Sequence, residues 1–437
     1  MPTSAASKYV SNRVAAMTTT LNLNTIQKLQ FNDKAAAERM LLEFLHRTQD
    51  PTIVAVELFP KPESLNSING LVTFRDQRKL FFKSHTEEAE QLKEYYNATV
   101  LKGAGYPVIT SNRVNTQPGQ QMAFYEIIEL PSLFDLVKQE EDAISNGLQE
   151  ELGQRLVKAQ RNLDEQTFDV YKSTWQEISA GEHASAPVHQ LFIHRLHEKG
   201  RVTNFYSGKR LKLNGDSIVF EDLATKRWLI NGVEYTQTLT DLIKQSRHSL
   251  TPSAGASVIG HGDAHNGNVF VDTKENKFFL FDPAFAGRHH PIIDLTKPLF
   301  HNVFAKWMYY PEQVAKEFEI SCKVSDDTVV VEHTFMPSSI REELLHSKIE
   351  LVLRPTLEYF RNKNMLPNDW QELLHSSLFC CPFLTVNLFA DFVPNGTLAE
   401  RYTLPIKLLG LAMAIELAAT PSSGTSRLRT TIDPIFR

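Results

Sequence analysis

The hydrophobic pattern of the first 130 residues changes from helical to alternating and back. Residues 32–50 carry Ala, Leu and Phe at helical spacing after Asn32 or Asp33, either of which can cap a helix, and Pro51 ends the pattern. A second helical pattern covers residues 86–101. Short runs rich in β-branched and aromatic residues are typical of strands: 52–59, 68–74, 79–84 and 123–128. This order predicts a small antiparallel sheet that carries one inserted helix.

From about residue 131 onward the pattern is mostly helical, with short β interruptions. Residues 147–179 predict one long helix or a broken pair. Residues 217–237 alternate and contain Asn231-Gly232, a strong signal for a two-residue hairpin turn, and residues 319–335 predict a second hairpin. The fold class is therefore α+β. Three parts are expected along the chain: an N-terminal helical extension (1–50), a small mixed lobe (51–130) and a larger, mostly helical lobe with inserted hairpins (131–437).

Composition and charge disfavour several classes of function. The 437 residues are enough for two or three lobes, since single cores stop growing near ~250–300 residues. The net charge is −5 and there is no long basic run, so a nucleic-acid partner is disfavoured. Three cysteines cannot form a disulfide framework. The most apolar late segment, residues 404–419, contains Lys407 and Glu416 and is too short to span a bilayer, so a cytoplasmic protein without a membrane partner is expected.

The stretch VIGHGDAHNGNVFVD (258–272) concentrates small polar residues between two apolar runs. It holds four residues able to do chemistry: His261, Asp263, His265 and Asn268. One interpretation is a simple hairpin that turns at Asn266-Gly267. The alternative is a functional site in the loop between two strands.

The spacing of the carboxylates favours the functional interpretation. Asn268 lies five residues after Asp263, and Asp282 follows the apolar run FFLF nineteen residues after Asp263. Phosphoryl transfer needs one carboxylate to orient the attacking hydroxyl and accept its proton, and oxygen ligands to hold Mg²⁺ on the phosphates. Zinc would have to rely on His261 and His265.

The motif HGDAHNGN…FDPAFAG resembles the catalytic segment of the aminoglycoside phosphotransferase and choline kinase group, whose members share the bilobal protein-kinase-like fold. The resemblance implies that Asp263 is the catalytic aspartate and that Asn268 and Asp282 bind magnesium. It also implies that three residues brace the catalytic loop: His261, His265 and Asp294. The resemblance spans about residues 64–294 and is thin through its long middle part.

The resemblance further implies an ATP site in the first part of the chain. Lys83, at the end of the third predicted strand, would contact the phosphates, and Glu88 in the following helix would hold it, with Glu90 as the next choice. The phosphate loop is expected in PKPESLNSING, which has one glycine in place of a Gly-x-Gly-x-x-Gly run and offers Ser64, Asn66, Ser67, Asn69 and Gly70. The adenine would bond to the backbone near Glu126 to Ile128.

The acceptor is less defined by the sequence. The run AGRHHP places Arg288, His289 and His290 just after Asp282, where they could meet an anionic part of the acceptor or bond to a neighbouring loop. The predicted function is an ATP- and Mg²⁺-dependent kinase of a small hydroxylated metabolite or antibiotic-like compound. A nucleotide-binding pseudokinase with a regulatory role is the alternative. A protein kinase is disfavoured because His-Gly-Asp replaces His-Arg-Asp and no Ala-Pro-Glu motif is present.

Overall fold

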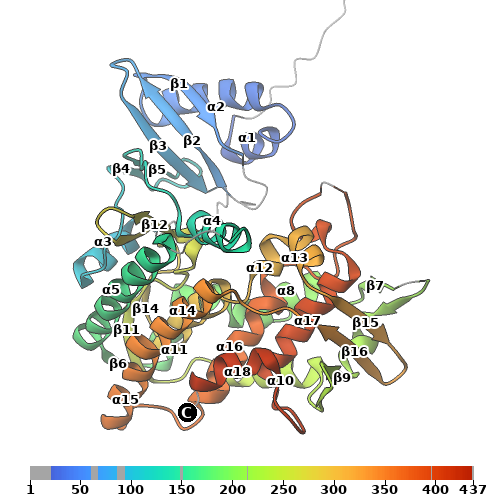
Figure 1. Cartoon of the computed structure of the whole chain (residues 1–437). Helices are drawn as coiled ribbons and strands as arrows, with labels where there is room; N and C mark the ends of the chain where they lie inside the picture. The colour runs from blue at the N-terminus through green and yellow to red at the C-terminus, as the bar shows by residue number, and fades with distance from the viewer. Residues whose placement is uncertain are drawn as a thin grey trace, which may run out of the picture. The chain divides into compact units, whose positions relative to one another are not determined.

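The computed structural model describes residues 21–60, 67–85, 94–147, 151–213, 215–394 and 396–435. The chain forms two compact units: unit 1 comprises Met1–Gln91 and Asn112–Ile127, and unit 2 comprises Leu92–Ser111 and Ile128–Arg437. Each unit combines helices with antiparallel strands (Figure 1), so the predicted α+β class is confirmed.

Unit 1 is a five-stranded sheet with two helices on one side. The strand order is β1-β2-β3-β5-β4, and every neighbouring pair is antiparallel. Asp33 caps α2, since its side chain accepts a hydrogen bond from the backbone N–H of Ala36 at 2.9 Å. The elements of unit 1 are α1 (Leu23–Leu29), α2 (Lys34–Thr48), β1 (Ile53–Leu58), β2 (Ser67–Phe74), β3 (Lys79–His85), β4 (Arg113–Asn115) and β5 (Met122–Tyr125).

The helices of unit 1 share one apolar core with its sheet. Ala37, Leu41 and Leu45 recur every four residues on α2 and are fully buried, as the helical period requires of one face. They belong to the same cluster as Leu58 on β1 and Phe82 on β3. The helical residues 34–48, which the sequence assigns to an N-terminal extension, are therefore part of the same compact unit as the sheet.

Unit 2 contains several small sheets between its helices. Its strands are β6 (Gln176–Ile178), β7 (Arg210–Lys212), β8 (Ser217–Val219), β9 (Arg227–Ile230), β10 (Val233–Tyr235), β11 (Gly255–Gly260), β12 (Val269–Asp272), β13 (Lys277–Leu280), β14 (Gly287–His289), β15 (Ile320–Val324) and β16 (Thr328–His333). They form a three-stranded sheet in the order β14-β11-β6, a four-stranded sheet in the order β10-β9-β16-β15, and the hairpins β12-β13 and β7-β8.

Both predicted hairpins are confirmed. Asn231 and Gly232 have φ values of 50° and 75°, the backbone conformation that a tight hairpin turn between β9 and β10 requires. Residues 319–335 contain the antiparallel pair β15-β16. The sequence did not predict that β16 pairs in parallel with β9, which joins the two hairpins into one sheet. Residues 151–174 form the single helix α5, so the broken-pair alternative is wrong.

The helices of unit 2 build its main core. The longer ones are α3 (Glu94–Ala104), α4 (Leu133–Ser145), α5 (Glu151–Thr174), α10 (Leu239–Ser249), α11 (Pro291–His301), α14 (Ser339–Lys348), α15 (Arg354–Asn362), α16 (Trp370–Thr385) and α17 (Leu404–Ala418). The short ones are α6 (Ala180–Ala184), α7 (Ile193–Leu196), α8 (Arg201–Phe205), α9 (Phe220–Ala224), α12 (Lys306–Tyr309), α13 (Pro311–Glu317) and α18 (Arg427–Ile432). Short 3₁₀ or π segments cover Pro187–Leu191, Asn266–Asn268, Ile349–Leu353, Ala399–Arg401 and Asp433–Ile435.

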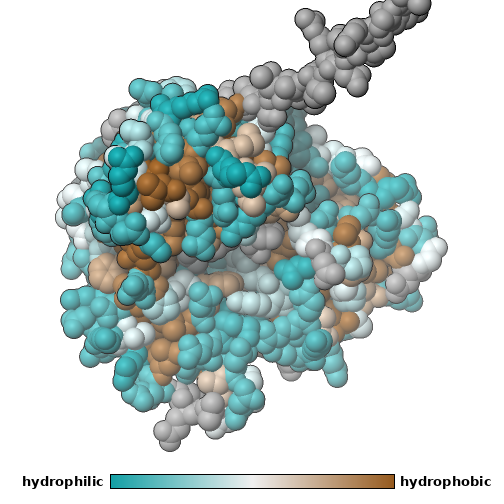
Figure 2. Space-filling model, turned by 90° about the horizontal axis from the view of Figure 1, so that it is seen from above, coloured by the Kyte–Doolittle hydropathy of each residue, from teal (hydrophilic) through white to brown (hydrophobic). Residues whose placement is uncertain are grey.

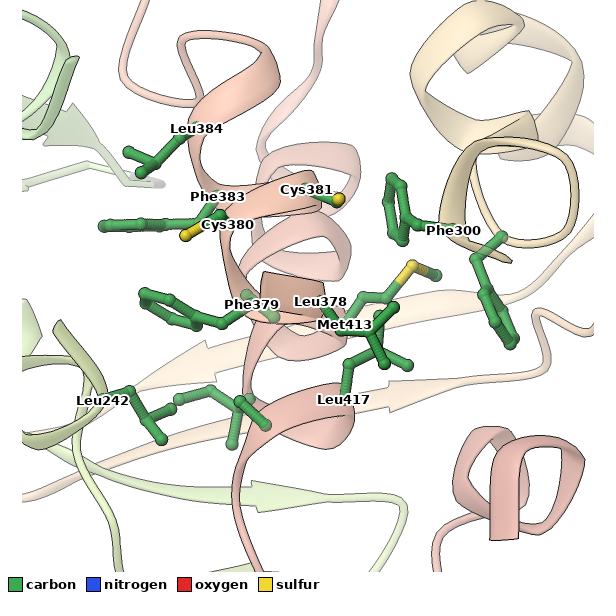
Figure 3. Close-up of a cluster of buried hydrophobic side chains, with 14 of the residues drawn as sticks. Leu242, Phe300, Leu378, Phe379, Cys380, Cys381, Phe383, Leu384, Met413 and Leu417 are labelled. Atoms are coloured by element: carbon green, nitrogen blue, oxygen red, sulfur yellow. The ribbon is translucent and has the colours of Figure 1, made fainter. Parts of the chain in front are cut away.

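The helix α16 is buried on all sides of its second half. Figure 3 shows Phe379 and Phe383 pointing to one side of α16 and Cys381 pointing to the other, toward Phe300 of α11. Cys380 and Cys381 are buried, as expected of thiols in an apolar stretch. Thr296 of α11 and Ser377 of α16 are joined by a hydrogen bond of 2.8 Å, which fixes one helix against the other.

The surface of the described residues is mixed rather than strongly apolar. Figure 2 shows a mostly hydrophilic face on which apolar residues form small patches. The exposed large hydrophobic residues come from separate segments of the chain: Phe31, Val54, Phe59, Val100, Ile127, Phe392 and Val393. Among the helices that the structure describes, none combines the length and the apolar character needed to cross a bilayer.

Candidate active site

The polar stretch of residues 261–268 is a loop between two different sheets. It leaves β11, which lies between β14 and β6, and enters β12, which pairs with β13 and forms one bridge to Ser132. Asn266–Asn268 form one 3₁₀ turn. The simple hairpin at Asn266-Gly267 is therefore wrong, because β11 and β12 do not pair with each other.

Asp294 of α11 holds the first half of this loop. Its Oδ1 accepts hydrogen bonds from the Gly262 N–H at 2.6 Å and from His289 Nε2 at 2.8 Å, and its Oδ2 accepts one from the Tyr171 hydroxyl. Burial alone would raise the pKa of Asp294, but the hydrogen bond and charge of His289, with the other donors, lower it overall. Asp294 is thus an ionised carboxylate held under the loop.

Two glycines allow this close approach. A Cβ at Gly260 would lie 2.4 Å from the Asp294 carboxylate, so no larger residue fits there. Gly262 has a φ of 78°, and a Cβ at Gly262 would lie 2.4 Å from the Phe285 carbonyl oxygen. The His-Gly-Asp sequence therefore has a steric reason for its glycine.

His261 and His265 use their ring nitrogens within the protein. His261 Nδ1 accepts a hydrogen bond from the Asp263 N–H at 3.3 Å, and its Nε2 donates one to the Phe281 carbonyl at 2.9 Å. His265 Nδ1 accepts one from the Gly267 N–H at 3.1 Å. Burial lowers the pKa of both imidazoles, which keeps them neutral. These contacts are those expected of bracing residues and give no support to a zinc site.

Asp263 lies at the middle of the loop with one oxygen available. Its Oδ2 lies 3.8 Å from His265 Nε2, and its Oδ1 lies 3.9 Å from Lys297 Nζ. Within the described residues, the buried Oδ1 has no hydrogen-bond partner. A buried carboxylate oxygen in that position can accept a proton or a hydrogen bond from a substrate hydroxyl.

Asn268 and Asp282 are brought together by the β12-β13 hairpin. Val269 and Leu280 are paired across the hairpin, and the Phe281 N–H donates to the Asn268 carbonyl at 2.9 Å, so Asp282 is the next residue. Asn268 Nδ2 donates to the Asp263 carbonyl at 2.9 Å. The sequence-predicted residues Asp263, Asn268 and Asp282 thus meet in one place.

The donor atoms of Asn268 and Asp282 fit a magnesium ion. Because Asn268 Nδ2 donates to the Asp263 carbonyl, the amide oxygen of Asn268 is left as an acceptor, and Asp282 offers a carboxylate. Two hard oxygen donors are what Mg²⁺ takes from a protein when phosphates supply others. No group of three or more His, Cys, Asp or Glu able to bind a metal occurs in the part of the chain that the structure describes.

The backbone at Asp282 is unusual. Asp282 has a φ of 55°, the left-handed region that a non-glycine residue seldom adopts. The carbonyls that follow it, those of Pro283 and Ala284, accept hydrogen bonds from Asn97 Nδ2 of α3 at 3.2 and 3.3 Å. Strained conformations of this kind persist where neighbouring contacts hold them, often at functional sites.

Unit 1 contains most of the residues predicted to bind ATP, and some of them lie outside the described part of the chain. Lys83 is buried in β3, where it is paired with Asn69 of β2 and Ala123 of β5, so it is not a solvated strand end. Gly70 must stay small, because a Cβ would lie 2.1 Å from the Glu57 carbonyl oxygen. Outside the described residues are Ser64, Asn66, Glu88 and Glu90.

The expected phosphate loop is partly revised, and the expected hinge stays a prediction. Ser67, Asn69 and Gly70 lie in β2, so the predicted loop ends before residue 67. Glu126 and Ile128 follow β5 in an extended segment that leads to α4, and the chain passes from unit 1 to unit 2 between Ile127 and Ile128. Glu126 accepts a hydrogen bond from Asn112.

Arg288, His289 and His290 bond to the protein around them. Arg288 Nη1 donates to the Thr174 carbonyl at 2.7 Å, and His289 holds Asp294 as described above. His290 caps α11 by accepting the Ile292 N–H at 3.2 Å. Of the two alternatives left open by the sequence, these contacts favour bonds to neighbouring elements over an acceptor site.

Lys297 is the residue that the sequence analysis missed. Its ammonium lies 3.1 Å from His301 Nε2 as well as 3.9 Å from Asp263, and its side chain is buried. Burial lowers the pKa of Lys297, and the charge of Asp263 offsets only part of this decrease. Lys297 stands one helical turn after Asp294, so the spacing within α11 could have indicated that both face the loop.

Comparisons with known proteins agree with this site. A family model described as the phosphotransferase enzyme family matches residues 210–319. This range contains four residues of the candidate site: Asp263, Asn268, Asp282 and Asp294. No curated protein matches the chain. The match confirms the resemblance inferred from the sequence, and it supports a small-molecule kinase as the class of enzyme.

Several solved structures are similar to the chain at a distance. An amicoumacin kinase in complex with AMP-PNP, Ca²⁺ and Ami is 13% identical, with 87% of this chain and 93% of that chain covered and a TM-score of 0.46. An ethanolamine kinase of Plasmodium vivax is 9% identical, with 90% and 93% covered and a TM-score of 0.45. An aminoglycoside-3'-phosphotransferase of type VIII is 12% identical, with 78% and 97% covered and a TM-score of 0.41.

Proposed function

We propose that this protein transfers the γ-phosphate of ATP to a hydroxyl group of a small molecule, with Mg²⁺ as the metal. The observation that carries the proposal is the junction of Asp263, Asn268 and Asp282. The Asn268 side chain donates to the Asp263 carbonyl at 2.9 Å, and the Asn268 carbonyl accepts the N–H of the residue before Asp282 at 2.9 Å. Phosphoryl transfer depends on this kind of positioning of one base and two metal ligands.

Each residue of the junction has a distinct role in the proposal. Asp263 would orient the acceptor hydroxyl and take its proton through Oδ1, which has no hydrogen-bond partner in the described residues. Asn268 and Asp282 would hold Mg²⁺, which neutralises charge on the phosphate oxygens when bound. Lys83, with Glu88 as its partner, would contact the nucleotide phosphates, a role that follows from the family resemblance.

The carboxylate of Asp263 is the most direct point at which to test the proposal. In Asp263→Asn, ADP release with Mg-ATP and a pool of hydroxylated metabolites should fall by about 10²–10⁴-fold, since general-base assistance contributes that much. Binding of ATP should stay unchanged, as measured by titration with a fluorescent ATP analogue. The matched control is Asp272→Asn, which alters a turn after β12 and should keep its turnover.

Two other outcomes would identify a different protein. Binding of Mg-ATP without ADP release for any acceptor would indicate a regulatory pseudokinase. Transfer of labelled phosphate to lysate proteins, and none to the metabolite pool, would indicate a protein kinase. Turnover of Asp263→Asn at the wild-type rate would remove Asp263 from its proposed role.

A further inference from the structure

Two arginines meet at the C-terminal end of α16. Arg201 Nη1 donates to the Leu384 and Thr385 carbonyls at 2.9 and 2.8 Å, and Arg195 Nη1 lies 3.4 Å from the same Leu384 carbonyl. Because both guanidinium groups bind one oxygen, they lie side by side. Leu384 itself points into the buried cluster around α16 (Figure 3), so this end of the helix is fixed.

The two guanidinium groups have no acidic partner. Within the described part of the chain, neither Arg195 nor Arg201 has a carboxylate within 4.0 Å, and the hydrogen bonds of both run through Nη1 alone. A guanidinium has five N–H donors, so Nε and Nη2 of each remain for another acceptor. Burial, followed by the charge of Arg201, lowers the pKa of Arg195 to about 9.

The two arginines at the end of α16 are linked to the catalytic carboxylate through α11 and Lys297. Lys297 Nζ is 3.9 Å from Asp263 Oδ1, and α11, which carries Lys297, is bonded to α16 through Thr296 and Ser377. The charge of Asp263 raises the pKa of Arg195, whereas Arg195 and Arg201 both lower the pKa of Lys297. Lys297 thus lies next to Asp263, and the charge of Asp263 also acts on Arg195.

Capping of α16 does not account for both arginines. The C-terminal end of a helix carries roughly half a negative charge. Two guanidinium groups bring roughly four times as much positive charge to it, and like charges placed together in a partly buried site repel each other. One arginine would suffice as a cap, so the excess charge needs another explanation.

We propose that the acceptor carries a carboxylate or phosphate group in addition to its hydroxyl, and that Arg195 and Arg201 bind this anion while the hydroxyl meets Asp263. The inference rests on the proposed phosphotransferase function and names the chemical class of its substrate. Paired arginines suit such a group because their planar N–H arrays match carboxylate and phosphate oxygens. The proposed anion site thus lies at residues 195–201 rather than at residues 288–290, for which the sequence left an acceptor role open.

Binding experiments with two compounds of the same carbon skeleton test the inference without relying on turnover. Tartrate carries hydroxyls and two carboxylates, and threitol is its neutral counterpart. Calorimetric titration of the full chain should show binding of tartrate and of inorganic phosphate but not of threitol. Arg195→Met and Arg201→Met should each weaken the binding of both anions by about tenfold or more, since a hydrogen bond to a charged group contributes that much.

The variants need controls for folding and for general charge. Arg247→Met is the matched control, because Arg247 also donates to a backbone carbonyl, that of Leu196 at 2.8 Å, and should leave anion binding unchanged. Arg201 supports the end of α16 through two carbonyls, so Arg201→Met can also lower stability. Thermal unfolding of the variant measures this loss. Arg195 has a single hydrogen bond, of 3.4 Å, to this end of α16, so Arg195→Met tests anion binding with less effect on folding.

The outcomes separate this inference from the proposed function. Failure of tartrate and phosphate to bind, or equal binding by wild type and Arg195→Met, would overturn the anion site. Turnover of neutral or cationic acceptors in preference to anionic ones would overturn it too, yet leave the kinase function standing. Anion binding that depends on Arg195, without ADP release for any hydroxylated anion, would support the site and count against the kinase function.

Discussion

The catalytic segment and the end of α16 satisfy their polar groups in opposite ways. In the catalytic segment, residues 261–294, three histidines bond to near neighbours in sequence: His261 with Asp263, His265 with Gly267, and His289 with Asp294. Tyr171 and Asn97 add contacts to the segment from outside it. At the end of α16, the hydrogen bonds of Arg195 and Arg201 join residues 189 and 183 positions apart and leave a net positive charge. The catalytic segment is thus largely self-contained, whereas the two arginines at the end of α16 carry a positive charge that has no acidic partner.

Asp294 is the strongest test of the self-contained segment. In Asp294→Asn we expect the free energy of unfolding to fall by about 3 kcal/mol, because a buried pair with His289 is broken. We also expect kcat to fall at least about tenfold, because the amide no longer holds the Gly262 N–H and His289 with one charged oxygen. Urea unfolding and ADP release measure the two effects.

The control for Asp294 is an exposed aspartate of the same unit. Asp222→Asn, in α9, should change the free energy of unfolding by less than about 0.5 kcal/mol. If Asp294→Asn kept both its stability and its kcat, the loop would be held by its glycines and histidines alone.

Lys297 links the two regions, and its variants are tested by their effect on the reaction alone. In Lys297→Met, kcat should fall about 10–100-fold, since removing one charge-assisted contact in a site of this kind costs about 1.5–3 kcal/mol. Lys297→Arg keeps the positive charge beside Asp263 and should retain part of the rate. Steady-state kinetics at saturating ATP would measure the change.

A buried lysine away from Asp263 serves as the control for Lys297. Lys306 is paired with Glu317 at 2.6 Å, so Lys306→Met should lower stability and leave kcat unchanged. Equal losses of kcat in both lysine variants would mean that the effect comes from disturbed packing.

The same contrast explains how much the sequence could predict. Asp263, Asn268 and Asp282 could be predicted because a loop and one short hairpin bring them together, so their spacing in sequence fixes their spacing in space. The parallel pairing of β16 with β9, and the meeting of Arg195 with Leu384, depend on tertiary packing and leave no such spacing. Arg288, His289 and His290 left two roles open in the sequence, and their contacts favour support of neighbouring elements.

His189 gives the smallest expected effect and tests where the self-contained segment ends. His189 lies outside residues 261–294 and is 2% exposed. In the described residues, neither of its ring nitrogens has a hydrogen-bond partner. Burial, with the charges of His289, His183 and His194, lowers its pKa to about 4. The unfolded chain binds this proton below pH 6.5 and the folded chain does not, so stability falls as the pH drops from 6.5 toward 4.

The size of this pH effect follows from the two pKa values. Between pH 7.5 and pH 5, His189 should lower the free energy of unfolding by about 2 kcal/mol, and His189→Leu should remove that part of the pH dependence. Urea unfolding of both proteins at the two pH values gives the comparison. Parallel pH profiles would show that His189 is already solvated in the folded state, and the supporting layer of the catalytic segment would then end at His289 rather than extend to residues 183–189.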